Sequence, residues 1–406
     1  MKKYVLPIAL FLMVFWMYFG ISTQWSFKPK WSLDYFNLLA QSLQRGRLDI
    51  LDPALTYDLV RVGGKWYAPW GALPAIFLIP LQIIKGRFIP PLYLTLFFAG
   101  ADAVVFYLLL RRLQKEFLPQ FSEFSLWSAW ALFTFGTTHA YVGTLGSSWH
   151  VDQMVTNFFG TLGIYFIFKK KRVIRDYFLS VLWLGIALLG RATIVLLVTI
   201  PAILYAGQYI LPKHISTEQR QQAILNGMVL FGIPLGFFST LFFAYNWLRF
   251  GSLFEYGYRF ITESPYLAQI REKNGILSLV NLPTNVWHML FELPSFSWEN
   301  GLKLNFNLKG NSIFFLTPPL LAIFLAKPMR TVEVAALWIA AVVTIVPSLL
   351  LYSTGWMQFG YRYTLDITAV LVILSVFGMK GRLNWLYVLG IFFSIVVYQM
   401  GITALM

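Results

Sequence analysis

The stretch YVLPIALFLMVFWMYFGIST, residues Tyr4–Thr23, carries no charged side chain and is long enough to cross a bilayer. A transmembrane helix needs about 20 predominantly apolar residues to span the hydrocarbon core. Two lysines precede this stretch, as in a signal peptide, but no small-residue cleavage site follows it. We therefore predict an uncleaved membrane anchor whose N-terminus is cytoplasmic.

The rest of the chain has the composition of a protein embedded in lipid. Of its 406 residues, 58% are hydrophobic and only 12% are charged, and the mean hydropathy is +0.65. A water-soluble fold could not bury this much apolar surface. The aromatic content of 18% suits a protein with many membrane–water boundaries. The composition predicts a polytopic membrane protein, and the absence of cysteine excludes disulfide bonds.

The net charge of +15 lies mainly in short loops between apolar runs. Because Lys and Arg are retained on the cytoplasmic side of short loops, this placement reports topology, and we expect no nucleic-acid partner. One alternating path puts all six basic clusters inside; they begin at Met1, Arg111, Lys169, Lys213, Lys327 and Lys380. The path predicts an all-α, polytopic transmembrane helical bundle of about eleven spans. It forms a single integral membrane domain, residues 1–406, with its C-terminus outside. The predicted spans are Tyr4–Thr23, Pro91–Leu110, Phe124–Gly143, Val151–Phe168, Asp176–Gly190, Ala192–Leu211, Ala223–Leu248, Ser312–Ala326, Thr331–Tyr352, Tyr363–Met379 and Leu383–Thr403.

Two long segments fall outside the membrane on this path, a first outer loop at 24–90 and a second at 249–311. The path requires that the apolar segment Gly71–Ile84 does not cross. That segment is short and contains Pro74 and Pro80, so we predict an amphipathic or re-entrant helix on the outer face.

Ionisable and polar residues from several separate segments gather at this outer face. Charges at a membrane are costly and usually mark either function or a satisfied structural pair. Their convergence from different parts of the chain therefore predicts a site. The candidate residues are Asp34, Asp58, Lys65, Tyr67, His150, Asp152, Arg191, Glu255, Arg259, Arg362 and Asp366.

Each candidate also has a structural interpretation. Asp34 heads a short amphipathic segment and could cap a helix. His150 and Asp152 could cap or anchor a helix end. Arg362 and Asp366 are four residues apart, the spacing of an ion pair on one helical face. Lys65 lies in GGKWYAPW, which reads first as a turn followed by interfacial anchors.

Two further residues have separate interpretations. His139, on an apolar run, is expected to be a satisfied core residue. Asp102, about midway along its span, fits a transport pathway better than a site at the outer face. The sequence contains no P-loop, no zinc-type His/Cys spacing and no GxSxG motif.

The order of these motifs resembles the GT-C superfamily of membrane glycosyltransferases. The resemblance rests on an outer loop that opens with Asp34 before YFNLLAQSLQRGRLDI, then GGKWYAPWGALPAIFLIP, and then an acid-headed span after GTLGSSWHVD. The chain is similar to the group of dolichyl-phosphate-mannose protein mannosyltransferases and lipid A aminoarabinose transferases. The late segments YNWLRFGSLFEYGYRF and GWMQFGYRYTLDITAVLVIL resemble stretches of other members.

The resemblance implies a cell-membrane enzyme that moves a sugar from a polyprenyl-phosphate donor to an acceptor at the outer leaflet. The acceptor is a lipid, a glycan or a protein. The resemblance implies that Asp34 is the catalytic base and that Asp152, or His150 beside it, is the second polar group across the cavity.

The chemistry agrees with this implication. Inverting glycosyl transfer needs a carboxylate to deprotonate the acceptor and cations to stabilise the departing phosphate. The candidate cations are Lys65, Arg191, Arg259 and Arg362, and Arg offers a bidentate fork. No cofactor is certain, and a divalent metal ion is a further candidate.

The alternative function is a multi-pass transporter or a flippase for lipid-linked sugars, which would also gather charges within the membrane. Against it, the sequence has no repeated half, and its charges favour one face. A scaffold without a site is the weakest alternative, because it would leave the outer loops free of convergent charge.

Overall fold

A computed structural model describes residues 2–29, 33–298, 302–327, 331–355 and 357–406. The α-helices are α1 (Lys2–Ser22), α2 (Phe36–Gln44), α3 (Leu73–Lys85), α4 (Pro91–Glu116), α5 (Glu123–Phe135), α6 (Thr138–Gly143), α7 (Ser148–Ile167), α8 (Ile174–Leu188), α9 (Thr199–Tyr205), α10 (Thr217–Phe250), α11 (Pro265–Asn274), α12 (Leu282–Leu290), α13 (Ile313–Leu316), α14 (Val332–Leu350), α15 (Leu365–Gly378) and α16 (Trp385–Leu405). The 3₁₀ and π segments are η1 (Ala192–Val198), η2 (Ala206–Ile210), η3 (Tyr258–Phe260), η4 (Leu279–Asn281), η5 (Pro318–Leu325) and η7 (Arg362–Thr364). The strands are β1 (Val60–Val62), β2 (Lys65–Tyr67), β3 (Ser295–Trp298), β4 (Leu302–Asn305), β5 (Lys309–Asn311) and β6 (Gln358–Gly360).

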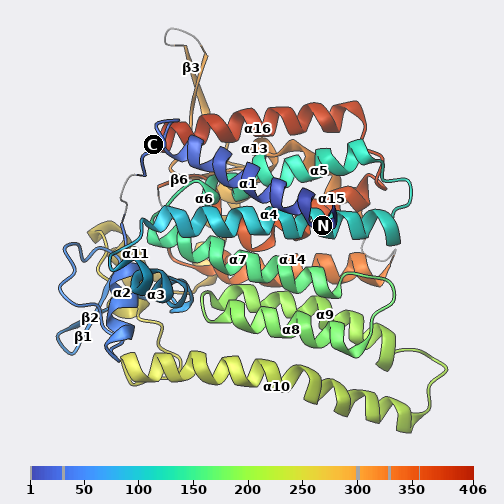
Figure 1. Ribbon diagram of the computed structural model, residues 1–406, viewed down its shortest axis with the longest axis horizontal. Helices are drawn as coiled ribbons and strands as arrows, with labels where there is room; N and C mark the ends of the chain where they lie inside the picture. Colours follow the sequence, from blue (N-terminus) through green and yellow to red (C-terminus); the bar gives the residue numbers. More distant parts are fainter. Residues whose placement is uncertain (1, 30–32, 299–301, 328–330, 356) are drawn as a thin grey trace.

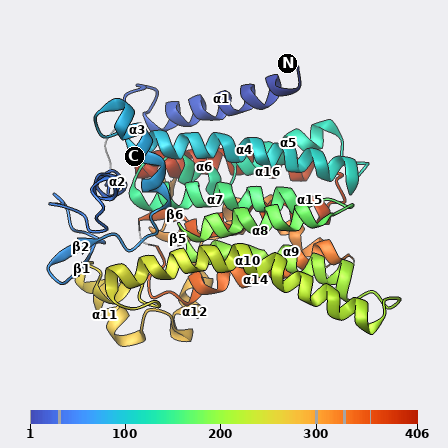
Figure 2. The ribbon, with the colours of Figure 1, turned by 60° about the horizontal axis from the view of Figure 1, so that its bottom comes forward.

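The long helices run side by side and form one bundle (Figure 1). Helices α7 and α15 lie inside it, and nearly every side chain of α15 is buried. Helices α10 and α16 lie at opposite edges in Figure 1, and α1 packs on α4 at the periphery (Figure 2). These three peripheral helices expose most of their apolar side chains. An apolar helix with an exposed face fits a lipid-facing position. The predicted helical membrane bundle is confirmed.

The described helices differ in how they match the predicted spans. Six of them are long and apolar enough to cross a membrane; they begin at Tyr4, Pro91, Ala192, Thr217, Val332 and Trp385. The predicted span Ser312–Ala326 is a short α13 followed by the 3₁₀ segment η5. Pro318 and Pro319 lack the N–H that a continuous α-helix needs. The number of crossings stays a prediction.

The polar connections of the first long loop cluster at one end of the bundle, on the left in Figure 1, which we call the loop end. Here α2, the β1–β2 hairpin and α3 lie together. Gln82 of α3 donates hydrogen bonds to the backbone and side-chain oxygens of Asn37 at 3.0 and 2.8 Å, which fixes α3 on α2. The segment Gly71–Ile84 therefore packs on α2 and does not run along the bundle.

A close contact ties the start of α3 to the turn after α8. The Gly71 N–H donates to the carbonyl of Gly190 at 3.2 Å, and a Cβ at Gly71 would lie 1.9 Å from the Leu189 carbonyl oxygen. Only glycine allows the two backbones to approach so closely. This contact brings Trp70 beside Arg191.

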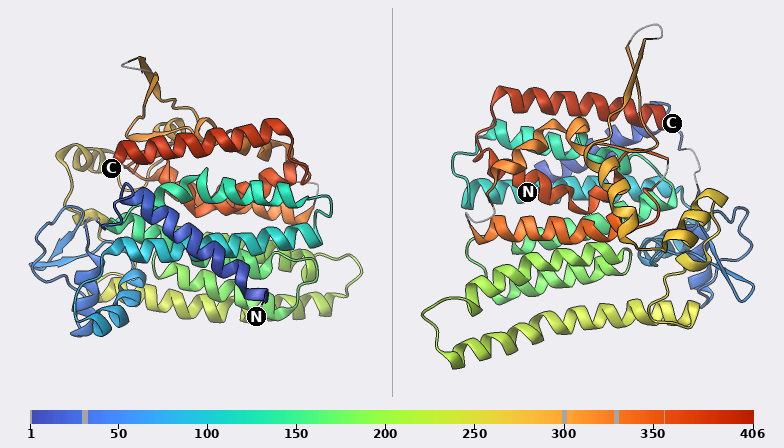
Figure 3. Two further views of the ribbon diagram at one scale, coloured as in Figure 1. Left: turned by 45° about the horizontal axis from the view of Figure 1, so that its top comes forward. Right: turned by 180° about the vertical axis from the view of Figure 1, so that it is seen from behind.

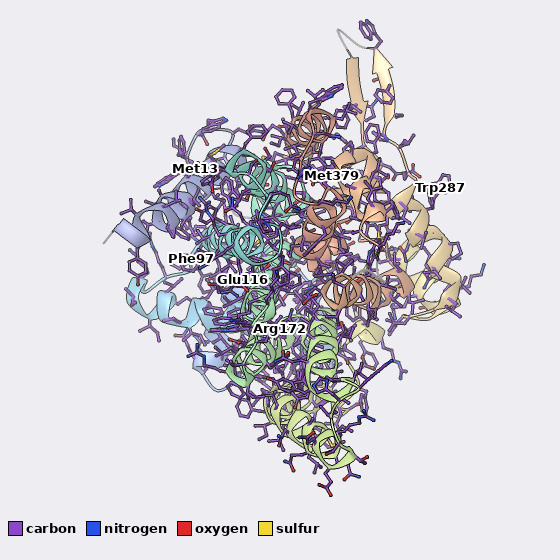
Figure 4. All side chains as sticks on the ribbon, turned by 90° about the vertical axis from the view of Figure 1, so that its right-hand side faces the viewer. Met13, Phe97, Glu116, Arg172, Trp287 and Met379 are labelled. Carbon is purple, nitrogen blue, oxygen red and sulfur yellow. The ribbon has the colours of Figure 1, made fainter. Side chains whose placement is uncertain are left out.

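The second long loop folds back across the end of α14. The backbone N–H of Ser278 donates to the carbonyl of Leu350 at 2.8 Å, and that of Tyr352 donates to the carbonyl of Ile276 at 3.0 Å. The β3–β4 hairpin of this loop projects away from the bundle (Figure 3). Seen end-on in Figure 4, Met13 and Phe97 lie on one side of the bundle and Trp287 at the opposite edge.

Candidate active site

A cavity of about 360 Å³ lies where both long loops meet the ends of α7 and α14. Most of its lining surface is apolar, but several charged side chains line it, and we call it the polar cavity after them. It collects residues that are up to 306 positions apart in the chain, between Tyr57 and Tyr363. Four of the predicted site residues line it: Asp58, His150, Arg191 and Arg362. The other lining residues are Tyr57, Pro69, Trp70, Trp149, Gln153, Tyr258, Ile261, Glu263, Leu267, Leu351, Tyr352, Ser353, Gly355, Met357 and Tyr363.

Asp58 is held over this cavity by a strained turn. Its φ of 61° lies in the left-handed region, which is unfavourable for a residue with a side chain. Its N–H donates to the Thr262 carbonyl at 2.7 Å, and the hydroxyl of Tyr35 donates to the Tyr57 carbonyl at 2.5 Å. Burial raises the pKa of Asp58 to about 6, although the nearby Arg362 guanidinium acts in the opposite direction. A carboxyl group with this pKa suits a general base near neutral pH.

Arg362 brings a buried cation to the cavity. Its guanidinium faces the rings of Trp149 and Tyr363, at 6.0 and 5.4 Å from their centroids. Its backbone N–H donates to Oε1 of Gln358 at 3.0 Å, and its carbonyl accepts from Gln153 at 3.3 Å. Within the described part of the chain, Nε has no hydrogen-bond partner and no carboxylate lies within ion-pair distance of the side chain. The geometry therefore leaves a fixed cation open to an anionic ligand.

Arg191 has a different environment, because two carboxylates flank it. Nη2 lies 3.4 Å from Asp366, and Nη1 lies 3.9 Å from Asp152. Thr193 also donates to Asp366 at 2.7 Å. Both carboxyl side chains are buried, so the three charged groups form an internal ion cluster that joins α7, α15 and the turn before η1. The alternative of an Arg362–Asp366 pair is therefore wrong, since Asp366 pairs with Arg191.

His150 lies in the first turn of α7 and faces the polar cavity. Its Nδ1 is 2.6 Å from the Ser147 hydroxyl, and its Nε2 is 3.4 Å from the Tyr141 hydroxyl. Asp152, two residues further along the helix, lies by the Arg191 cluster. His150 and Asp152, which the sequence analysis grouped together, therefore have different neighbours: His150 faces the polar cavity, and Asp152 lies beside Arg191.

A groove of about 340 Å³ adjoins the polar cavity and shares six lining residues with it: Pro69, Trp70, Arg191, Tyr258, Leu351 and Tyr363. It runs between η1, α10 and the end of α14. Its walls are mainly apolar, with Leu196, Phe242, Leu277 and Pro347 among the lining residues. Its charged and amide side chains are those of Asp152, Arg191, Asn246 and Arg249, and Thr193, Ser348, Tyr256, Tyr258 and Tyr363 add hydroxyl groups.

Asp34 lies two residues before the start of α2, where its carboxylate accepts from a first-turn N–H, and it is not a lining residue of either the cavity or the groove. Its carboxylate accepts from the backbone N–H of Asn37 at 3.1 Å and from the Asn37 side chain at 2.6 Å. Burial raises the pKa of Asp34 to about 6 against the effect of these hydrogen bonds. Because the pKa of Asp58 has the same value, position and not pKa separates the two carboxylates.

The other four predicted residues are also not lining residues of the polar cavity. Lys65 is exposed on the β1–β2 hairpin, directly after a two-glycine turn. Tyr67 packs edge-on against Phe250 at 5.7 Å. Glu255 accepts from the Gly257 N–H at 2.7 Å, and Arg259 is exposed on η3.

The sequence interpretation missed two residues that shape the site. Trp149 precedes His150 and lines the cavity beside Gln153, four residues on along the same helix. Arg249, buried at the end of α10, donates to the Ala68 carbonyl and stacks on Tyr245 at 3.8 Å. Arg249 thereby holds the segment that carries Trp70. One feature of the sequence points to Arg249: a single arginine at the end of a long apolar run is costly unless its side chain has hydrogen-bond or charged partners.

A second buried polar cluster lies inside the bundle. Asp102 accepts from Asn157 at 2.6 Å and lies 3.5 Å from His139, whose other ring nitrogen is 2.9 Å from the Tyr18 hydroxyl. These side chains are fully enclosed. His139 is thus a partnered core residue, and Asp102 joins helices. The part of the chain that the structure describes contains no group of three or more His, Asp or Glu side chains placed to hold a metal ion.

The arrangement of helices is that of a known class. The structure is similar to the oligosaccharyltransferase of Archaeoglobus fulgidus in its apo form, with a TM-score of 0.56 and 13% identity over 99% of this chain and 56% of that chain. The fold is therefore GT-C-like, the fold of a class of membrane glycosyltransferases.

Two further structures are similar at lower scores. ArnT from Cupriavidus metallidurans bound to undecaprenyl phosphate has a TM-score of 0.49 and 11% identity over 94% of this chain and 61% of that chain. Archaeal AglB from Archaeoglobus fulgidus in complex with an inhibitory peptide and a dolichol-phosphate has a TM-score of 0.48 and 12% identity over 98% and 56%. The chain spans only 56–61% of the length of these three structures. No protein-family model and no curated protein matches the chain.

Proposed function

We propose that this protein is a membrane glycosyltransferase that moves a sugar from a polyprenyl-phosphate donor to an acceptor at the outer leaflet. The observation that carries the proposal is that the apolar groove and the polar cavity lie side by side and share Trp70, Arg191 and Tyr363 as lining residues. A donor of this class has an isoprenoid chain, an anionic phosphate and a hydroxylated sugar. Those three parts match an apolar groove, a buried cation and a polar cavity, in that order.

The isoprenoid chain would lie in the groove between η1, α10 and α14, against apolar residues such as Leu196 and Phe242. The chain would enter from the bilayer, whose interior is as apolar as the groove, so van der Waals packing and not removal from water would hold it there. The phosphate would meet Arg362, because Arg191 already forms an ion pair with Asp366 at 3.4 Å and lies 3.9 Å from Asp152. Arginine binds phosphate through a planar fork of donors.

Asp58 is the proposed base, in place of Asp34. It would accept the proton of an acceptor hydroxyl while that oxygen forms a bond to the anomeric carbon of the donor. The bond between this carbon and the phosphate oxygen breaks, and the phosphate leaves with the electron pair. Arg362 would stabilise the charge that develops on the phosphate. The supporting observations are that Asp58 lines the cavity and has a pKa of about 6, whereas Asp34 is occupied as a helix cap.

The loop end is proposed to face outward from the cell membrane, with the N-terminus in the cytoplasm. The support is that the loop end lies at one end of the bundle, whereas the short Lys- and Arg-containing connections α4–α5, α7–α8 and η2–α10 lie at the other (Figure 1). Since the chain contains no cysteine, single cysteines can report orientation. In intact cells, Lys65→Cys is expected to react with an impermeant thiol reagent and Lys170→Cys is not; both positions are exposed. The reverse pattern would overturn the orientation.

The test of the activity is incubation of the purified protein with a panel of polyprenyl-phosphate sugars, scored by release of the polyprenyl phosphate. Wild type is expected to release the carrier from at least one donor. Asp58→Asn is expected to abolish release, while Asp34→Asn serves as the matched carboxylate control from the same loop. Absence of release with every donor, together with substrate-dependent flux in liposomes, would replace this proposal with the transporter or flippase alternative.

A further inference from the structure

A small third pocket adjoins the polar cavity. Its volume is about 180 Å³, and it lies between α11, η4 and the start of α12. It shares Leu267 and Tyr352 with the polar cavity and no lining residue with the groove. The three spaces therefore follow one another as groove, cavity and pocket. We call this third space the asparagine pocket, after its lining residues Asn274, Asn281 and Asn285.

The amide groups of this pocket have defined orientations. Nδ2 of Asn285 donates to the carbonyls of Leu349 at 2.9 Å and Leu351 at 2.8 Å. Carbonyl oxygens only accept hydrogen bonds, so the Nδ2 and Oδ1 atoms of Asn285 cannot be exchanged. Asn281 likewise donates to the carbonyl of Leu350 at 3.1 Å. The backbone end of α14 thus fixes both side chains.

This fixation leaves an acceptor without a partner. Asn285 is only 2% exposed, and its Oδ1 has no hydrogen-bond partner among the described residues. A buried polar atom without a partner costs about 1–3 kcal/mol. Oδ1 of Asn281, by contrast, accepts from Asn274 at 3.0 Å. A ligand that supplies an O–H or N–H donor to Asn285 would remove this cost.

The remaining lining residues define the chemistry of the ligand. Thr284, Thr354, Tyr352 and Tyr266 add hydroxyl groups, and none of the lining residues is acidic. Lys309 adds one cation, whose Nζ donates to the Tyr266 hydroxyl at 3.3 Å. Leu267, Ile270 and Val280 form an apolar wall. A sugar ring has hydroxyl groups on its edge and C–H groups on its face, so it complements both kinds of surface. At 180 Å³ the pocket is smaller than the roughly 300–1,000 Å³ of drug-sized sites, which fits one ring.

We propose that the asparagine pocket binds a saccharide unit of the acceptor, so that the substrate class of the acceptor is a glycan. This inference rests on the proposed glycosyltransferase activity. A neighbouring hydroxyl of the bound saccharide would extend past Tyr352 into the polar cavity. There it attacks the anomeric carbon, its proton passes to Asp58, and the carrier phosphate leaves with the electron pair. The donor and the acceptor would reach the polar cavity from two separate neighbouring spaces.

The test fills the pocket without disturbing the asparagines. Thr284 is exposed at the rim and lines the pocket, so Thr284→Trp is expected to occupy it. Leu279→Trp is the matched control, because Leu279 is 75% exposed on the neighbouring turn and does not line the pocket. Should Thr284→Trp lower the unfolding temperature, Val280→Trp fills the same pocket from another exposed position.

Sugar transfer from the polyprenyl-phosphate donor is measured with a panel of free mono- and disaccharides as acceptors, alongside a panel of serine- and threonine-containing peptides. The expected result is transfer to a saccharide, with the acceptor KM raised at least tenfold in Thr284→Trp and unchanged in Leu279→Trp. Carrier release to water is expected to stay at the wild-type rate in Leu279→Trp.

Three results would overturn the inference: an unchanged saccharide KM in the filled variants, transfer to peptides only, or carrier release to water with no saccharide accepted. Each of these leaves the proposed activity intact, because the carrier is still released. Failure of the wild type to release the carrier at all would instead contradict the proposed function.

Discussion

Replacement of Arg362 by methionine tests whether this arginine binds the ligand or stabilises the fold. The Arg362 side chain has no ion pair in the described part of the chain, and its Nε has no hydrogen-bond partner although the residue is only 8% exposed. Folding therefore gains little from its charge. Methionine keeps the length of the aliphatic stem. We expect Arg362→Met to change the free energy of unfolding by no more than about 1 kcal/mol.

Arg191→Met is the matched control, because this arginine holds two buried carboxylates together. Removal of one partner from a buried ion cluster typically costs about 3–5 kcal/mol, since the remaining charges are left without compensation. The two variants remove the same chemical group from the lining of the same cavity. Thermal unfolding of both purified proteins in one detergent compares their stabilities directly.

For donor binding we expect the reverse ranking: Arg362→Met should weaken the affinity for polyprenyl phosphate more than Arg191→Met does. A hydrogen bond to a charged group contributes about 1.5–3 kcal/mol, so loss of the Arg362 fork is expected to weaken binding of polyprenyl phosphate roughly 10- to 100-fold. Arg362→Lys should fall between Arg362→Met and wild type, because lysine keeps the charge without the fork. The assay is equilibrium binding of polyprenyl phosphate to each variant.

Two outcomes would refute this reasoning. Arg362→Met would destabilise the fold as strongly as Arg191→Met if the Arg362 charge were part of the packing. Unchanged affinity for polyprenyl phosphate in a well-folded Arg362→Met would show that the phosphate is held elsewhere. Arg249, which also lines the groove, would then be the next cation to test.

Four further variants test the base and the packing. Because burial raises the pKa of Asp58 from 3.8 to about 6, the rate of sugar transfer by wild type should increase as pH rises through about 6. Asp58→Asn should lose roughly 100-fold or more in kcat. A wild-type rate that is flat across this pH range would contradict the role of Asp58. The same shift means that the carboxyl stabilises the fold fully below pH 3.8 and that this contribution is lost as pH rises through about 6, so Asp58→Asn should be at least as stable as wild type near neutral pH. Asp34→Asn keeps a cap on α2, so a stability loss of about 1 kcal/mol or less and activity within a few-fold of wild type are expected; a loss of activity as large as that of Asp58→Asn would return the role of base to Asp34. Gly378→Ala places a Cβ 1.9 Å from the Ala322 carbonyl oxygen and should lower the free energy of unfolding by about 1–3 kcal/mol. Gly232→Ala, with open space around it, should leave this free energy unchanged or raise it by up to about 1 kcal/mol. Equal unfolding temperatures for the two variants would refute the close packing of α15.

Hydropathy predicted the helical bundle because the length and apolarity of a lipid-crossing helix are properties of a continuous stretch of sequence. It also predicted that Gly71–Ile84 does not cross the membrane, because this segment is short and contains two prolines. The structure packs the segment on α2, and the absence of a crossing stays a prediction. Hydropathy did not predict that the segment η1–α9–η2 is interrupted. Their 3₁₀ and π geometry depends on contacts with neighbouring helices, which hydropathy does not report.

The candidate site was only partly predictable for a similar reason. The sequence favoured Asp34 over Asp58, but which of two loop carboxylates faces a cavity depends on a left-handed turn at Asp58. The spacing of Arg362 and Asp366 suggested an ion pair on one helical face. Arg362 lies instead in the 3₁₀ turn η7, before α15 begins, so the i,i+4 geometry of an α-helix does not apply. Asp366 meets Arg191, which is 175 residues away.

The central claim is that one ligand occupies the groove and the cavity together, and a structure of the protein with bound polyprenyl phosphate, determined by electron cryomicroscopy, tests it most directly. The account predicts density for the isoprenoid chain between η1, α10 and α14, with the phosphate within hydrogen-bond distance of Arg362. Density for the phosphate at Asp34 or Lys65, or for the ligand inside the bundle beside Asp102, would contradict it.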